Sequence, residues 1–199
     1  MSETKNKYDF VISGAGLVGC LSAILLSRMG YSCCLIEKNI IATEKETNAY
    51  NPISLNYRSI LILKKFKIWD DLQKISYPIK SLTLKSFNSF SRLYFTANDL
   101  NLDSLGYVFD RHKLLKIFRN ILSQEDKILV FDSSEVEVIN YNKSSNHLNL
   151  IINNKNLSKE ITINTKYLIA SDGDKSNIKK SLHIDSQSID YSQTSYIFN

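Results

Sequence analysis

The chain has 199 residues, of which 43% are hydrophobic and 23% charged, and its formal net charge is +5. This length fits one ordinary domain, or one domain with the start of a second, and the composition excludes a disordered or fibrous protein. The longest apolar stretch, Leu17 to Leu26, is much shorter than the roughly 18 residues that a membrane helix needs. The polar start of the chain is unlike a signal peptide.

The number of cysteines and the distribution of charge narrow the class of protein further. The three cysteines, Cys20, Cys33 and Cys34, are an odd count, which favours free thiols in a reducing cytoplasm over a disulfide framework. Basic residues form no block and do not alternate with aromatic ones, so nucleic acid is not expected as a partner. A weak attraction to anionic membrane surface fits the charge. The sequence predicts a soluble cytoplasmic protein with at most peripheral contact at the inner face of a membrane.

The first forty residues predict a strand, a glycine loop, a helix and a second strand. Tyr8 to Ser13 has the pattern of a buried strand, and the loop from Gly14 to Gly19 follows it directly. An apolar helix is expected over Leu17 to Met29 and a second strand over Ser32 to Ile36, which ends at the acidic Glu37. This order is the fingerprint of dinucleotide-binding βαβ units.

Each position of this fingerprint has a chemical reason. Gly14 permits the tight turn, Gly16 lets a pyrophosphate approach the backbone, and Gly19 lets the helix pack close to the strand. The helix N-terminus offers N–H groups to the diphosphate, and Glu37 can accept from both ribose hydroxyls, which disfavours the 2′-phosphate of NADP at this position. Half of the six glycines lie in this loop. The alternative is a tight turn in an α/β domain that binds nothing.

The middle of the chain predicts a polar loop, helices and short strands. The polar loop spans residues 41 to 57, and Asp110 is expected to cap a helix. The expected helices are Arg58–Leu72, with Trp69 near its end, and Arg111–Leu122; the expected strands are Ser81–Ser86, Arg92–Phe95 and Tyr107–Phe109.

The last third predicts strands that return to an Asp-Gly pair. The expected strands are Lys127–Phe131, Glu135–Tyr141, Leu148–Ile152, Glu160–Asn164 and Tyr167–Ala170, followed by Ser171-Asp172-Gly173. A simple dehydrogenase would continue with alternating strands and helices. The hairpin-rich middle points to a different α/β protein.

These motifs, in this order, resemble the group A flavin aromatic hydroxylases, the para-hydroxybenzoate hydroxylase-like family. Within it they are most similar to the 2-polyprenyl-6-methoxyphenol hydroxylases of ubiquinone biosynthesis. The likeness covers nearly the whole chain. It rests on Asp9 to Gly19, Leu35-Ile36-Glu37, Ser59-Ile60-Leu61 to Ile68-Trp69, Leu105 to Val108 with Arg111, Ala170 to Gly173 with Ser176, and Asp190 to Gln193.

The resemblance implies an α/β fold with a Rossmann-like FAD-binding domain of the glutathione-reductase type, a β-hairpin insertion and the start of a substrate-domain sheet. The FAD-binding domain would span residues 1–180, with strands near 81–96 on the substrate-domain side, and 181–199 would begin a truncated substrate domain. Tyr191 to Phe198 would form an unpaired edge strand. Because the family is roughly twice this length, the resemblance implies an N-terminal half.

The resemblance also implies a reaction and a set of binding residues. FAD would be the cofactor, NAD(P)H the reductant and dioxygen the oxidant for hydroxylation of a polyprenylated phenol, without a protein nucleophile or metal. The implied FAD-binding residues are Gly14, Ala15, Gly16, Leu17, Val18, Gly19, Glu37, Lys38, Asn51, Arg111, Val130, Asp172 and Gly173.

Individual roles follow from family position. Arg111 would lie near the phosphate and ribityl region, although a first-turn surface position of a helix is the alternative. Asp172 would bond the ribityl chain or stabilise the loop beneath the pyrophosphate, and the backbone of Val130 would face the adenine. Two positions depart from the family: Asn51 and Lys179 stand where arginines are usual, and lysine lacks the bidentate fork. The three histidines have no ligand spacing.

Three functions remain open from the sequence. The first is an FAD-dependent hydroxylase of ubiquinone synthesis, alone or with a chain that supplies a C-terminal half. The second is a non-catalytic remnant that binds adenine dinucleotide or packs in a quinone-synthesis complex. The third is an NAD-binding reductase subunit, which Asp172-Gly173 and the hairpins disfavour.

Overall fold

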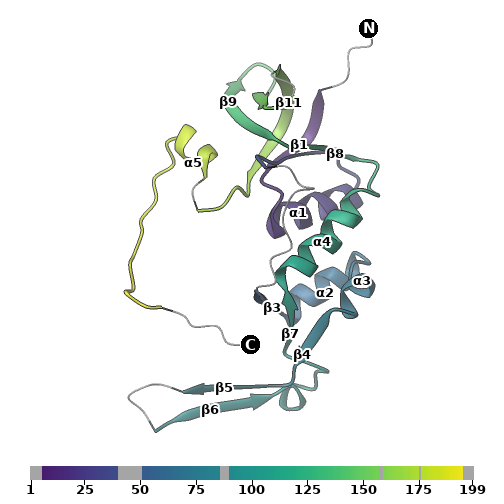
Figure 1. The fold of residues 1–199 in the computed structure, drawn as a ribbon, viewed down its shortest axis with the longest axis vertical. Helices are drawn as coiled ribbons and strands as arrows, with labels where there is room; N and C mark the ends of the chain where they lie inside the picture. The colour runs from purple at the N-terminus through teal and green to yellow at the C-terminus, as the bar shows by residue number, and fades with distance from the viewer. Residues whose placement is uncertain (1–5, 40–50, 86–89, 157–158, 175, 195–199) are drawn as a thin grey trace. The chain divides into compact units, whose positions relative to one another are not determined.

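The computed structural model describes residues 6–39, 51–85, 90–156, 159–174 and 176–194 (Figure 1). It contains two compact units, one made of residues 1–45 and 118–199 and the other of residues 46–117. In the described part of the chain, no helix has the length and apolar character needed to cross a bilayer.

The first unit is built on a six-stranded sheet in the order β8-β2-β1-β11-β10-β9. β8, β2, β1 and β11 are parallel neighbours, and β10 and β9 continue the sheet in antiparallel fashion. The strands are β1 (Lys7–Ser13), β2 (Cys33–Ile36), β8 (Ile128–Phe131), β9 (Ser134–Asn142), β10 (His147–Asn154) and β11 (Lys159–Ala170). The parallel part thus has the Rossmann order, and its strand order reverses between β1 and β11.

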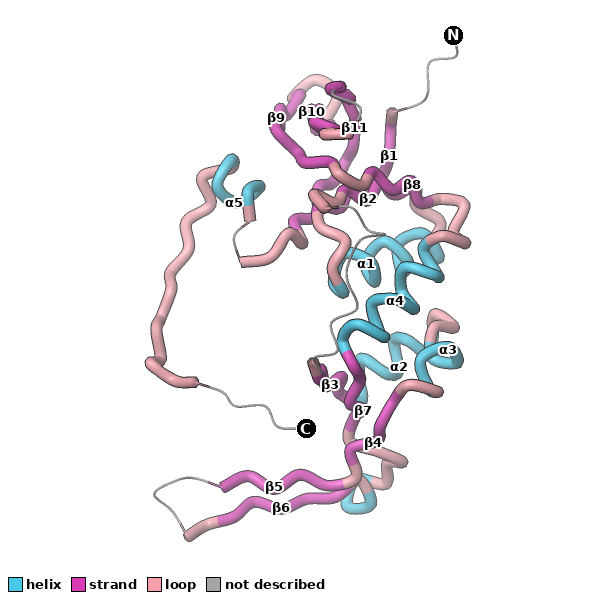
Figure 2. Tube along the Cα trace, in the orientation of Figure 1, coloured by secondary structure: helices cyan, strands magenta, loops and turns pink. Residues whose placement is uncertain are grey.

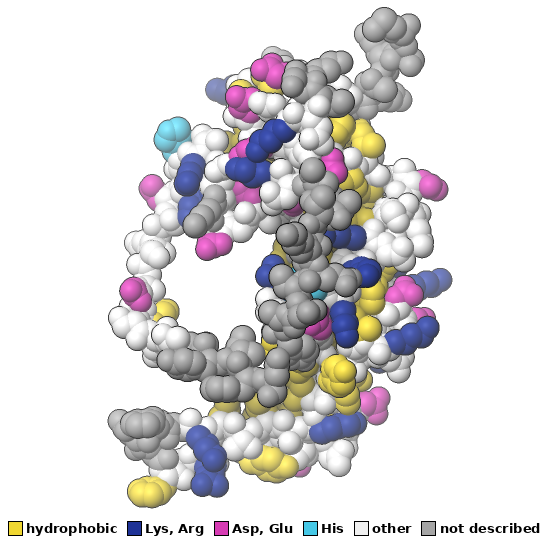
Figure 3. Space-filling view, viewed as in Figure 1, with side chains coloured by type: hydrophobic (Ala, Val, Ile, Leu, Met, Phe, Trp, Pro, Cys, Tyr) yellow, Lys and Arg dark blue, Asp and Glu magenta, His cyan; other side chains and the backbone are white. Residues whose placement is uncertain are grey.

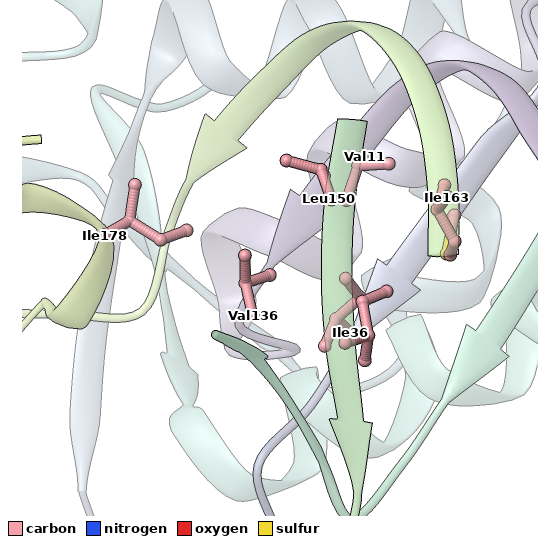
Figure 4. Close-up of a cluster of buried hydrophobic side chains, with 8 residues drawn as sticks. Val11, Ile36, Val136, Leu150, Ile163 and Ile178 are labelled. Atoms are coloured by element: carbon pink, nitrogen blue, oxygen red, sulfur yellow. The ribbon is translucent and has the colours of Figure 1, made fainter. Parts of the chain in front are cut away.

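Two helices, α1 and α5, pack against this sheet. Helix α1 (Leu17–Arg28) is apolar on nearly all sides and packs on β1, β2 and β8, with Cys20, Ala23 and Ile24 fully buried. A cluster of buried side chains joins β1 and β2 to β9, β10, β11 and the short helix α5 (Asn177–Ser181) (Figure 4). Its members are Val11, Cys34, Ile36, Val136, Leu150, Ile152, Ile163 and Ile178.

The second unit contains a three-stranded antiparallel sheet in the order β3-β7-β4 and a separate hairpin, β5–β6 (Figure 2). Its buried apolar side chains include Ile60, Leu63 and Phe109, and the Trp69 and Tyr107 rings meet edge to face at 4.7 Å. The elements are β3 (Pro52–Asn56), α2 (Tyr57–Lys65), α3 (Trp69–Gln73), β4 (Ser76–Ile79), β5 (Ser81–Lys85), β6 (Arg92–Thr96), a 3-10 turn (Asn98–Leu100) and β7 (Gly106–Asp110). Helix α4 (Arg111–Leu122) begins in this unit, and its last residues belong to the first.

The expected α/β, Rossmann-like arrangement is confirmed, and four local predictions are wrong. The helix expected over Arg58–Leu72 is two helices, because Lys67 adopts a left-handed φ of 56° between them. The loop expected over 41–57 contains β3, which pairs with β7. The strand β4, which contains Pro78, is absent from the expected elements; Pro78 is tolerated there because β4 is an edge strand.

The fourth error concerns the end of the sheet. The two strands expected over Glu160–Asn164 and Tyr167–Ala170 are one continuous strand, β11, whose first half pairs with β10 and whose second half pairs with β1. Thr165 pairs with both neighbours, so the strand passes from one partner to the other without a break. The edge strand expected from Tyr191 is not present over its described residues 191–194, and the remainder of it lies outside the described residues.

Candidate functional site

The candidate site lies where the strand order reverses, at the carboxyl ends of β1 and β11. Gly14 follows β1 and donates its backbone N–H to Ile36 O at 2.8 Å, and Ser171 follows β11 and donates its N–H to Ser13 O at 2.8 Å. In open α/β sheets, ligands bind in the crevice beyond such strand ends. The expected glycine loop and Asp-Gly pair are therefore brought to one edge of the sheet.

Two glycines of the loop are required by the protein itself. Gly14 has a φ of 98°, and a Cβ there would lie 2.5 Å from Ser171 O. A Cβ on Gly19 would lie only 1.8 Å from Gly14 O, because α1 starts directly against the loop. These two positions explain the close packing of loop, helix and β11.

Gly16 differs, because a Cβ there would meet no atom within 4 Å. Gly16 is the N-cap of α1 and no side chain caps the first turn of the helix. The open space and the uncapped N–H groups of the first turn, which come from the stretch that includes Leu17 and Val18, suit an anionic group such as a diphosphate. The fold therefore does not itself require a glycine at position 16, and the open space there leaves room for a ligand.

Glu37 lies against the glycine loop from the end of β2. Its Oε2 accepts the backbone N–H of Ala15 at 2.7 Å, and its Oε1 accepts that of Asn39 at 3.0 Å. Each carboxylate oxygen has more than one lone pair, so both can still accept from ribose hydroxyls. Val130, the position expected beside the adenine, pairs in β8 with Leu35 of β2 and is 37% exposed.

Ser171 belongs to the site, although the sequence patterns did not identify it as a site residue. Its hydroxyl donates to Ser13 O at 2.8 Å and to Gly14 O at 3.0 Å, so a single O–H is shared between two carbonyls of the opposite strand end. This contact joins the Asp-Gly turn to the glycine loop. A small hydroxyl residue directly before Asp172 was the sequence signal that could have indicated it.

Asp172 has one carboxylate oxygen engaged and one available. Oδ2 accepts the backbone N–H of Asn177 at 2.9 Å, whereas Oδ1 is buried and has no hydrogen-bond partner among the residues that the structure describes. A buried acceptor without a partner is uncommon in native proteins, and a ligand hydroxyl would satisfy it. Gly173, with a φ of 88°, makes the turn that follows. The residues at this sheet edge therefore fit FAD.

The other expected binding residues lie elsewhere or are engaged differently. Lys38 forms an ion pair with Glu135 at 3.2 Å. Asn51 and Arg111 belong to the second unit, where Asn51 O accepts the backbone N–H of Arg111 at 2.9 Å across β3 and β7. The exposed Arg111 is the first residue of α4, which Asp110 caps by accepting the Lys113 N–H at 3.0 Å. Their contact with FAD stays a prediction.

Lys179 and the metal-binding residue types add no further group to the site. The backbone N–H of Lys179 donates to Ser176 Oγ at 3.1 Å, which caps α5. Among the described residues, no group of three or more His, Cys, Asp or Glu side chains could hold a metal ion. A polar hollow of about 370 Å³ lies over β9, β10 and α5, lined by residues such as Glu137, Lys155 and Lys180, and no expected FAD-binding residue lines it.

The clearest electrostatic effects lie along β1 and β2, away from the loop. The backbone N–H of Ser32, the Lys166 ammonium at 2.9 Å and the Ser32 hydroxyl lower the pKa of Asp9 to about 2. Burial, and to a lesser extent the charge of Asp9, raises the pKa of Cys33 to about 11, and burial also raises the pKa of Cys34. Both thiols are therefore protonated at neutral pH and are part of the core rather than nucleophiles.

The chain is similar to curated proteins of ubiquinone biosynthesis. It is 26% identical over 209 residues to the mitochondrial ubiquinone biosynthesis monooxygenase COQ6 of Dictyostelium discoideum, covering 96% of this chain and 42% of that protein. It is 25% identical to the ubiquinone hydroxylase UbiM of Neisseria meningitidis, covering 95% of this chain and 41% of that protein. The chain thus spans less than half the length of these relatives.

Solved structures of flavin enzymes share the fold. The p-nitrophenol 4-monooxygenase PnpA of Pseudomonas putida superposes with a TM-score of 0.73 at 15% identity, over 91% of this chain and 45% of that one. The flavin-dependent monooxygenase PieE, solved in complex with FAD and substrate, gives a TM-score of 0.73 at 17% identity, over 90% of this chain and 32% of that one.

The family itself is shown by a match over almost the whole sequence. Residues 7–199 match the family described as "FAD binding domain", which confirms the expected family and its cofactor, FAD. The chain belongs to the FAD binding domain family.

Proposed function

We propose that this chain forms the FAD-binding part of a monooxygenase that hydroxylates the aromatic ring of a polyprenylated ubiquinone precursor. Two features together carry the proposal. Gly16 lies beside open space, and the buried Oδ1 of Asp172 has no partner among the described residues. Both lie at the sheet edge where dinucleotides bind in this topology. When bound, FAD supplies the transfer of electrons from NAD(P)H to dioxygen.

The roles of the chain's own residues follow from their contacts. The backbone at Gly16 and the first turn of α1 hold the diphosphate, and Glu37 accepts from the adenosine ribose while it holds Ala15 in place. Asp172 Oδ1 accepts from a hydroxyl of the ribityl chain. By family position we assign Arg111 to the phosphate and ribityl region of the same cofactor, Asn51 to its flavin ring, and the backbone of Val130 to the adenine.

The substrate class comes from the relatives. COQ6 and UbiM are named for ubiquinone biosynthesis and ubiquinone hydroxylation, and both match more than nine tenths of this chain. A polyprenylated phenol is therefore the substrate class that we assign, with NADH or NADPH as the reductant. In this proposal the protein works in the cytoplasm and meets its lipid-like substrate at the inner face of a membrane.

A second candidate function is FAD binding without catalysis, as a subunit or remnant in a quinone-synthesis complex. The observation that favours it is that Gly16, Glu37 and Asp172, the residues with a structural case for FAD, account for binding of the cofactor and not for a reaction of a substrate. The two candidates differ in whether the bound FAD takes part in hydroxylation at all, with or without a further polypeptide.

Absorption spectroscopy of the purified chain tests the cofactor site. The chain is mixed with FAD, desalted and scanned in the visible range, beside Asp172→Ala and the matched control Asp126→Ala, which removes an exposed carboxylate after α4. Flavin bound by the wild type and the control, and lost from Asp172→Ala, is the expected result. A wild type that is mixed with saturating FAD and retains no flavin after desalting would contradict the assignment of the site to this chain.

Oxidation assays then separate the two candidate functions. NADH and NADPH oxidation is followed with a prenylated phenol and dioxygen, with and without a polypeptide equivalent to the unmatched part of COQ6. Hydroxylated product in either arm supports the monooxygenase. Flavin binding without product in both arms favours the non-catalytic role.

A further inference from the structure

The short helix α5 governs how the Asp172 carboxylate is held at the candidate site. The backbone N–H of Asn177, the first residue of α5, donates to Asp172 Oδ2 at 2.9 Å. Within the ranges that the structure describes, the buried Oδ1 of Asp172 has no partner. A helix of five residues is not stable by itself, so the position of α5 depends on contacts with the rest of the protein. Residues that hold α5 therefore also hold Asp172.

Strand β9 holds α5 through one apolar and one polar contact. Ile178 of α5 and Val136 of β9 belong to the same buried cluster, at 3% and 6% exposure (Figure 4). The residues next to them make the polar contact, because the side-chain amide of Asn177 donates to Glu135 Oε1. A carboxylate acceptor makes such a hydrogen bond stronger than a neutral acceptor does. Glu135 thus fixes the side chain of Asn177, whose backbone N–H binds Asp172.

Glu135 also contacts the segment that follows β2. Lys38 donates to the same oxygen, Oε1, at 3.2 Å. The backbone N–H of Ser134, the residue before Glu135, donates to Glu37 O at 2.8 Å. Figure 3 shows acidic and basic side chains interspersed over the surface around α5, so these particular contacts, rather than a field of one sign, orient the carboxylate. The start of β9 thus links the Glu37 side of the site to the Asp172 side.

We propose that Glu135 is a positioning residue for FAD. It holds Asn177 and thereby keeps Asp172 Oδ1 available to the ribityl chain of the cofactor. Lys38 in turn orients the Glu135 carboxylate, which gives this lysine a part in positioning. The inference rests on the proposed function, because it needs Asp172 to bind the cofactor. Since the effect is confined to the ribityl end, a ligand without a ribityl chain should not respond to the loss of Glu135.

Ligand titrations of the full chain test this positioning. FAD and ADP are each titrated into the wild type, Glu135→Ala, Asn177→Ala and the variant with both substitutions. ADP carries the adenosine and the diphosphate but no ribityl chain. Quenching of flavin fluorescence measures the dissociation constant for FAD, and calorimetry measures that for ADP. The matched control is Glu137→Ala, which removes an exposed carboxylate further along β9.

In each single variant the dissociation constant for FAD should rise about tenfold, whereas that for ADP should stay within about twofold of the wild type. The double variant should bind FAD no more weakly than either single one, because both substitutions remove the same contact. The control should bind both ligands as the wild type does. An unchanged affinity for FAD in Glu135→Ala, or an equal loss for FAD and ADP, would overturn the inference.

Hydrogen exchange in the ligand-free chain separates this inference from the proposed function. The amide of Asn177 should exchange about tenfold faster in Glu135→Ala than in the wild type or in Glu137→Ala, because its bond to Asp172 opens more often. Unchanged exchange overturns the positioning role even when FAD binds. A wild type that binds neither ADP nor FAD contradicts the proposed function, and exchange at Asn177 then decides whether Glu135 holds the Asp172 turn.

Discussion

The glycine loop after β1 and the β5–β6 hairpin are both short exposed features, yet their surroundings differ. The loop is fixed from three sides by contacts of this chain, through Ile36, Glu37 and Ser171. Among the described residues, the hairpin is held by its own ladder and by the bond from the Thr96 N–H to Asp99 Oδ2 at 2.7 Å, and its leucines remain exposed. The loop therefore has its shape before a ligand arrives, whereas the described contacts of the hairpin leave its leucines exposed. Substitutions in the two regions should accordingly affect different measurements.

The largest expected effect on stability comes from Gly19→Ala in the glycine loop. The added Cβ would lie 1.8 Å from Gly14 O, so α1 must move away from the loop, and the free energy of unfolding should fall by about 3 kcal/mol or more. Chemical denaturation measures this loss. Gly16→Ala is the matched control, because its Cβ meets nothing within 4 Å. It should unfold like the wild type yet bind FAD more weakly, and equal destabilisation by both substitutions would contradict the distinction between them.

A smaller change at the loop is Glu37→Gln. The amide keeps the size of the side chain but loses the charge that strengthens its bonds to Ala15 and, in our proposal, to the ribose. The dissociation constant for FAD should rise by about tenfold or more, since hydrogen bonds to charged groups contribute roughly 1.5–3 kcal/mol. Quenching of flavin fluorescence measures it. Glu137→Gln, at an exposed position of β9, should leave FAD affinity unchanged.

Asp9→Asn tests the contacts near the start of β1, the strand that leads into the glycine loop. Asp9 accepts from Ser32 and Lys166, and these contacts hold its pKa near 2, below the ordinary value of 3.8. A lowered folded-state pKa means stability that is present above about pH 4 and lost as the pH falls toward 2. The variant should lose about 1 kcal/mol at pH 7. Unfolding curves from pH 7 to pH 2.5 should show the difference from the wild type shrinking at the acidic end, and a constant difference would contradict this assignment.

The smallest expected effect is on the stability of the hairpin variant. Leu84→Ser with Leu93→Ser replaces two side chains of the β5–β6 hairpin that are 52% and 58% exposed, so the free energy of unfolding should change by less than about 0.5 kcal/mol in solution. Thermal unfolding measures it. A loss of several kcal/mol would show that these leucines stabilise the fold itself, in contrast to their exposed state.

Local sequence patterns predicted the first unit well. Tyr8–Ser13, the glycines of the loop and Glu37 form a continuous signal in which each residue type has one structural reason. The structure confirms the strand, and it places the loop and Glu37 together at the carboxyl end of that strand. The pairing of β11 with both β10 and β1 could not be read locally, because the residues between Asn164 and Tyr167 have no pattern that tells a turn from a strand that changes neighbours. The contact of Ser171 with Gly14 likewise depends on which strands become neighbours.

The second unit was harder to predict for a different reason. The run from Arg58 to Leu72 has helical periodicity throughout, and the break at Lys67 depends on a left-handed backbone that lysine rarely adopts. Ile53 and Leu55 of β3 lie in a polar stretch, and they become a strand because β7 offers an edge to pair with. The FAD contacts of Asn51 and Arg111 rest on family position alone and stay predictions.

The bond from Ser171 to the glycine loop has a consequence for the order of folding. The Ser171 hydroxyl bonds to Ser13 and Gly14, which lie 158 and 157 positions earlier in the chain. The strand β11 joins β1 over a similar separation. A contact of such high contact order forms late, and during synthesis it must wait until β11 has left the ribosome. The glycine loop is thus synthesised well before β11, the strand whose contacts complete its final shape. Until then the nascent chain exposes one edge of β1.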